Sequence, residues 1–142
     1  MCKLLSLNVL LVLTLLSPAM GEGRKLGKLF IKTAPVAEGQ FADPTLEDTV
    51  KDMKKRSGDF VIVTDESEAD FLIVVLERKV VLKSPLGTVV NDKTVVATLS
   101  VRDGSAWKPA IKLEHGGGTG WGVAAGRVIG DAEKWVKANA AK

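Results

Sequence analysis

The chain has 142 residues, of which 46% are hydrophobic and 26% charged, and its formal net charge is +3. This globular composition argues against wholesale disorder, and so small a charge with scattered lysines gives no support to nucleic-acid binding. The single cysteine, Cys2, cannot form an internal disulfide, and loss of the segment that contains it would leave no thiol nucleophile or thiolate metal ligand.

Residues 1–21 have the pattern of a secretory signal peptide. A lysine precedes a mostly apolar run over residues 8–16, and small residues follow at Ala19 and Gly21. The run is too short to span a bilayer as a stable helix, and no later segment is long and apolar enough to do so. We predict an exported protein, periplasmic or extracellular, in which cleavage after Gly21 (or after Ala19) leaves residues 22–142 as a single domain.

The first predicted elements of that domain are a short strand at residues 29–31 and a helix that begins after a proline-containing loop. Asp43 can cap the helix, Pro44 suits its first position, and Gly58 can end it. The apolar stripe of this helix, spaced i, i+4, i+7, is Leu46, Val50 and Met53.

Two apolar runs, residues 60–63 and 71–76, follow the helix and are joined by an acidic turn. β-Branched and aromatic runs bounded by turn formers are typical of strands, and six unbroken apolar residues predict a central strand covered on both faces. Beyond Glu77 the pattern reduces to one predicted apolar face, on which Arg78 is the exception. That face comprises Leu72, Val74, Leu76, Val80 and Leu82.

Residues 94–102 alternate as a half-buried strand does, and Asp103-Gly104 is a strong hairpin signal. The returning strand contains Pro109, which lacks a backbone N–H donor, so it should lie at an edge of the sheet. Its predicted inner face is Trp107, Ile111 and Leu113. A last helix is expected from about Val123 to Ala140, with an apolar stripe of Trp121, Ala125, Val128, Ala132 and Trp135.

This order predicts an α+β fold of two layers. The sheet should be mostly antiparallel with about five strands, the element order β-α-β-β-β-β-α, and both helices on one face.

Motifs that could support catalysis are incomplete. Residues 120–125 match the start of a dinucleotide fingerprint, but the strand with an acidic residue that should follow is missing. Residues 115–118 resemble the oxyanion loop of lipases, yet the chain has no G-x-S-x-G elbow and only one histidine. The acidic turn lacks the glycine and final glutamate of a calcium loop. We therefore predict no enzyme activity, no cofactor and no metal site.

The candidate interaction surface is a strip of glycines at every fourth residue, next to a tryptophan at the start of the last helix. Such a strip lets another backbone approach closely, either the chain's own sheet or a helix of a neighbouring subunit, and the sequence leaves both alternatives open. The residues are Gly118, Trp121, Gly122, Gly126 and Gly130. A second candidate surface is the polar strand face of Thr94, Thr98 and Ser100.

Residues 60–76 carry a resemblance to a group of envelope proteins. A strand is followed by a polar link, the pair Ala69-Asp70, and a long apolar strand. This pattern resembles the amino-terminal α/β domain of TolB and periplasmic assembly domains of the CsgG and LpoB type, and the element order is similar over residues 27–140. The resemblance implies a periplasmic scaffold or accessory module without catalytic residues. The chain differs in having no cysteine after its apolar run and no expected second domain.

These observations predict an exported, non-catalytic envelope domain that binds another envelope protein or itself. The alternative is a small-molecule binding protein that uses the glycine-rich segment 116–122 and Trp121.

Overall fold

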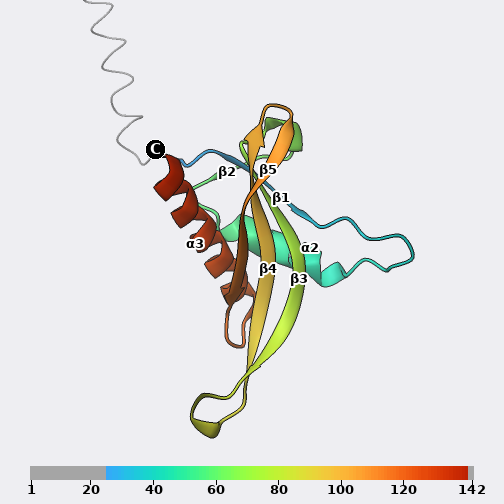
Figure 1. Cartoon of the computed structure of the whole chain (residues 1–142), viewed down its shortest axis with the longest axis vertical. Coiled ribbons are helices and arrows are strands. Elements are labelled where there is room, and N and C mark those ends of the chain that lie inside the picture. The colour runs from blue at the N-terminus through green and yellow to red at the C-terminus, as the bar shows by residue number, and fades with distance from the viewer. Residues whose placement is uncertain (1–24, 141–142) are drawn as a thin grey trace, which may run out of the picture.

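A computed structural model describes residues 25–140, so the predicted signal peptide lies outside the described residues. One five-stranded sheet has the strand order β2-β1-β3-β4-β5, and the helices α2 and α3 pack on one of its faces (Figure 1). The strands are β1 (Lys28–Thr33), β2 (Val61–Ile62), β3 (Phe71–Lys83), β4 (Val90–Asp103) and β5 (Ala106–Gly116), and the helices are α2 (Pro44–Arg56) and α3 (Trp121–Ala140). Short 3-10 turns lie at η1 (Glu66–Glu68) and η2 (Pro85–Gly87).

The predicted fold class and element order are confirmed. The pairs β3–β4 and β4–β5 are antiparallel, whereas β1 pairs in parallel with both β2 and β3, so the sheet is mixed but mostly antiparallel. The two apolar runs after α2 are not neighbours, because β1 lies between β2 and β3. The run 71–76 begins the central strand, and β5 with Pro109 forms an edge, both as predicted.

Local signals place α2 correctly. The Asp43 side chain accepts a hydrogen bond from the Thr45 backbone N–H at 2.9 Å, and Pro44 is the first helical residue. α3 begins at Trp121, two residues earlier than predicted. Neither helix within residues 25–140 combines the length and the apolarity of a bilayer-spanning segment.

The hydrophobic core lies between the helices and the inner face of the sheet. Its strand residues are Leu29, Ile31, Ile73, Val75, Val95, Ala97, Leu99 and Leu113, and its helix residues include Val50, Met53, Ala124, Ala125, Val128, Ile129, Ala132 and Val136. The alanines of α3 let this helix lie close to the strands.

The single apolar face predicted for residues 72–82 is wrong, because β3 contains a β-bulge. The register with β4 shifts between Val75 and Glu77, so that Val75 pairs with Ala97 but Arg78 pairs with Val95. Since a bulge inserts an extra residue, it moves the following side chains to the opposite face. The inner face therefore carries Val75 before the bulge and Arg78 after it.

Past this bulge, the β3–β4 hairpin runs on, and its outer part continues beyond the body of the domain (Figure 1). We call residues 77–96 the arm; its base still belongs to the body, since Val95 is fully buried in the core. It ends in η2, where Leu86 has a positive φ of 55°.

Candidate functional site

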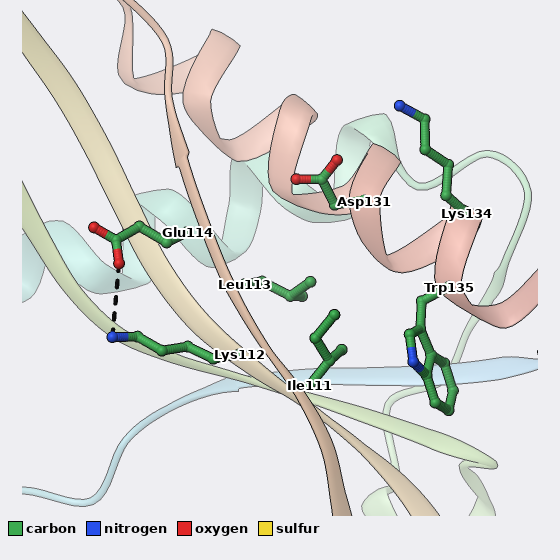
Figure 2. Close-up of a pocket in the computed structure, with 7 residues that line it drawn as sticks. All are labelled: Ile111, Lys112, Leu113, Glu114, Asp131, Lys134 and Trp135. Carbon is green, nitrogen blue, oxygen red and sulfur yellow. Dashed lines mark ion pairs between the residues drawn. The ribbon is translucent and has the colours of Figure 1, made fainter.

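The clearest surface feature is a groove between the edge strand β5 and the carboxyl-terminal half of α3. Three adjacent hollows share Trp135, and the largest has a volume of about 430 Å³. In Figure 2 the Trp135 ring projects from α3 toward β5, and the side chains of Ile111 and Leu113 project from β5 toward α3. We define the groove by its apolar residues Val101, Pro109, Ala110, Ile111 and Trp135.

The groove exists because α3 crosses the sheet near its edge. Ala132 and Val136 are buried in the core, but the next position of the stripe, Trp135, is only half-buried. On β5 a second register shift, opposite Leu99 and Ser100, inserts Ala110 and turns the strand. Ile111 lies on the inner face as predicted and is 38% exposed there, whereas Trp107, predicted on the same face, is moved by the bulge to the opposite face, where it pairs with Arg102.

Charged side chains flank the upper end of the groove on two sides. Asp131 and Lys134 of α3 line the largest hollow. The side chains of Lys112 and Glu114 point away from α3, on the far side of β5 (Figure 2), where Glu114 lies 2.7 Å from the Nζ of Lys79 and 3.6 Å from that of Lys112. The hydrogen bond from Lys79 is the main reason that the pKa of Glu114 lies below its ordinary value. The opposite end, around Val101 and Ala110, is apolar, so the groove suits a hydrophobic contact more than a reaction.

The glycine-rich passage between β5 and α3 is held by the chain's own residues. Asp92 Oδ1 accepts a hydrogen bond from the Gly118 N–H at 2.8 Å, and its Oδ2 lies 2.6 Å from Lys83 Nζ. A Cβ at Gly116 would lie 1.9 Å from Asp92 Oδ2, and one at Gly117 would lie 2.3 Å from the Ala124 nitrogen. The Asp92 carboxylate and the backbone of α3 thus lie too close to these two positions to leave room for a side chain.

Asp92 should make the stability of the fold depend on pH. The hydrogen bonds from Lys83 and then from the Gly118 backbone lower the pKa of its carboxyl group. Because the folded-state pKa lies below the unfolded value, the stabilisation is complete above about pH 4 and is lost as the pH falls through the folded-state pKa. We expect Asp92→Asn to lower the melting temperature at pH 7 and the two proteins to converge as the pH falls below the folded-state pKa of Asp92.

Thermal unfolding followed by circular dichroism at neutral and acidic pH measures this effect. Asp48→Asn, at an exposed carboxylate of α2, is the matched control. A difference between Asp92→Asn and the wild type that stays constant across the pH range would contradict the assignment.

The glycine strip is not a uniform surface. The Arg56 side chain of α2 covers two of its members, since a Cβ at Gly122 would lie 2.8 Å from Arg56 Nη2 and one at Gly126 would lie 2.8 Å from Arg56 Cδ. A Cβ at Gly130 would meet no atom within 4 Å, and Gly118 has a positive φ of 63° in the passage. The strip thus contacts α2 at Gly122 and Gly126, whereas a Cβ at Gly118 or Gly130 would meet open space.

Trp121, the fifth predicted site residue, lies at the first position of α3 and is packed by cations of the arm. The guanidinium carbon of Arg78 lies 4.0 Å from its ring centroid, and Lys93 Nζ lies 5.6 Å away. Arg78 also donates a hydrogen bond to the Thr45 carbonyl of α2 at 2.9 Å. These contacts with Trp121 and Thr45 explain why Arg78 interrupts the apolar residues of its strand.

The other predicted surface, on the outer strand face, is largely closed. Thr94 and Ser100 are 4% and 7% exposed, so only Thr98 offers a half-buried side chain. Within residues 25–140, no three His, Cys, Asp or Glu side chains gather in a way that could hold a metal ion.

No family model matches the chain, and no curated protein matches its sequence. Solved structures with a similar fold include the hypothetical protein CT253 from Chlamydia trachomatis, at 11% identity and a TM-score of 0.49, over 79% of this chain and 99% of that one. Another is a PelC dodecamer from Paraburkholderia phytofirmans, at 14% identity and a TM-score of 0.44, over 80% and 90%. A third is a minor lipoprotein from Acinetobacter baumannii, at 12% identity and a TM-score of 0.43, over 82% and 94%. Likenesses this distant carry no conclusion about function.

Proposed function

We propose that this chain is an exported, non-catalytic accessory domain that binds another envelope protein or a second copy of itself through the groove. One observation carries the proposal: Trp135, which lines three adjoining hollows, is half-buried, and Ile111 lies partly exposed in the largest of them. A half-buried tryptophan within an apolar depression is the kind of residue that anchors protein–protein contacts.

Export and the envelope setting are supported by the signal-peptide pattern of residues 1–21 and by the resemblance of residues 60–76 to TolB, CsgG and LpoB type domains. The absence of catalytic motifs from the sequence supports a binding role. We propose no cofactor and no nucleic-acid partner.

A charge placed in the groove should remove the partner. Chemical cross-linking of the wild type in cells should give a discrete product of the chain with its partner. We expect Ile111→Lys to abolish this product, because a lysine cannot enter an apolar contact without losing its hydration. Ile111 lies on an edge strand and is 38% exposed, so the variant should still fold, which its circular-dichroism melt will show.

The matched control is Val123→Lys, which adds the same charge at a 49% exposed position of α3 outside the groove residues. Cross-linking followed by mass measurement compares the three proteins. If Ile111→Lys gives the same products as the wild type, the groove is not the binding site.

A further inference from the structure

We infer that the groove of one copy receives the tip of the arm from a second copy, in a reciprocal pair. This inference rests on the proposed function, because it names the occupant of the same groove. Each molecule exposes two apolar surfaces, the tip of the arm and the groove, and a pair of copies would cover both.

The first feature is the tip of the arm. Its large apolar side chains have no helix over them, because α3 begins at Trp121, where Arg78 and Lys93 of the arm's base pack. Their exposed fractions lie between 41% and 104%, and they are Val80, Leu82, Leu86, Val89 and Val90.

The tip is also almost uncharged. Between Val80 and Asn91 the only ionisable side chain is Lys83, and its ammonium group is paired with Asp92 at 2.6 Å. An apolar tip whose single charge is already paired suits an apolar protein surface better than a charged one.

The groove is complementary in character but lies at the other end of the molecule. Along β4, Val90 belongs to the arm tip and Val101 to the groove, a separation of eleven residues or roughly 35 Å. A chain therefore cannot fill its own groove with its own arm. Two copies placed antiparallel bring each tip beside the partner's groove.

Area favours the reciprocal arrangement over a single insertion. If a full Val or Leu side chain presents roughly 100 Å² of apolar surface, the tip offers on the order of 300 Å². Stable interfaces bury about 800 Å² per partner, so one tip in one groove falls well short. A reciprocal pair uses the tip and the groove of each copy and about doubles the contact.

Direct pairing of two β5 edges is the competing arrangement, and the strand is guarded against it. Pro109 lacks a donor, Ala110 forms the bulge, and Lys108 and Lys112 are exposed. Prolines, bulges and lysines are the features that prevent edge-to-edge association of strands.

Engineered disulfides test the pair. The full chain with Cys2→Ser has no thiol, so Leu86→Cys and Ala110→Cys can be introduced in separate preparations of this background and mixed under mild oxidation. We expect a disulfide-linked species of twice the chain mass that contains one copy of each variant, in at least tenfold excess over the product of a control mixture. The control mixes Phe41→Cys, on the β1–α2 loop and 100% exposed, with Ala110→Cys.

Light scattering of the wild type across a concentration series provides the second measurement. We expect a dimer that Leu82→Ser combined with Leu86→Ser converts to a monomer. A strictly monomeric wild type, a species that grows beyond the dimer, or equal cross-linking of the Phe41→Cys control would overturn the reciprocal pair. If the wild type is monomeric but its cross-link to a different protein still requires Ile111, the proposed function stands without the reciprocal pair. If neither a dimer nor a cross-link that depends on Ile111 is found, the proposed function is overturned as well.

Discussion

Gly117→Ala should destabilise the fold by about 2–3 kcal/mol, close to the upper range for a single added methyl group. The added Cβ would lie 2.3 Å from the Ala124 nitrogen and 2.4 Å from the Gly120 carbonyl oxygen. Both are backbone atoms at the start of α3, so neither can rotate away as a side chain could. The passage would have to move, and it would carry with it the hydrogen bond from the Gly117 N–H to the Lys93 carbonyl.

The control is another glycine of the same region. A Cβ at Gly130 would meet no atom within 4 Å, and the residue lies inside α3. Gly130→Ala should therefore raise the free energy of unfolding by about 0.5–1 kcal/mol, because alanine is the better helix former. Urea unfolding of both variants measures the difference, and changes of the same sign would contradict the assigned contacts.

This pair of variants also bears on the glycine strip as an interface. If Gly130→Ala stabilises the chain and leaves its solution mass unchanged, the open glycine within α3 is not needed for association. The strip would then serve packing against α2, where Arg56 covers Gly122 and Gly126.

The sequence predicted those parts of the fold that depend on neighbouring residues. The start of α2 followed from Asp43 and Pro44, and the edge position of β5 followed from Pro109, because a cap and a missing donor act locally. The sequence also suggested the α+β order, since the helices and the half-buried strand had a clear apolar period and the run 71–76 had the length and composition of a buried strand.

The candidate site was much harder to predict, because it depends on contacts between distant segments. Trp135 falls on the apolar stripe of α3 and was expected in the core, yet it is half-buried because the helix crosses the sheet near its edge. The bulge after Val75 leaves no sign in the apolar pattern, since both faces of that run are hydrophobic. The role of Gly116 depends on Asp92, which comes from another strand.

The largest loss of stability should come from Ile73→Ala. Ile73 is fully buried in the central strand β3 and belongs to the core. Its truncation should lower the free energy of unfolding by about 2–5 kcal/mol, because the rigid strands on both sides cannot collapse into the space left behind. Urea unfolding with an unchanged slope would assign the loss to the folded state.

The same strand offers the contrasting variant, Leu82→Ala, nine residues farther along in the arm and 70% exposed. At a concentration at which the chain is monomeric, we expect it to change the free energy of unfolding by less than about 0.5 kcal/mol, as surface substitutions usually do. A loss as large as that of Ile73→Ala would show that the arm packs within its own fold. A negligible loss would mean that Leu82 contributes little to the stability of the single chain, so its apolar side chain is free to be buried against a second copy without loss of contacts within its own fold.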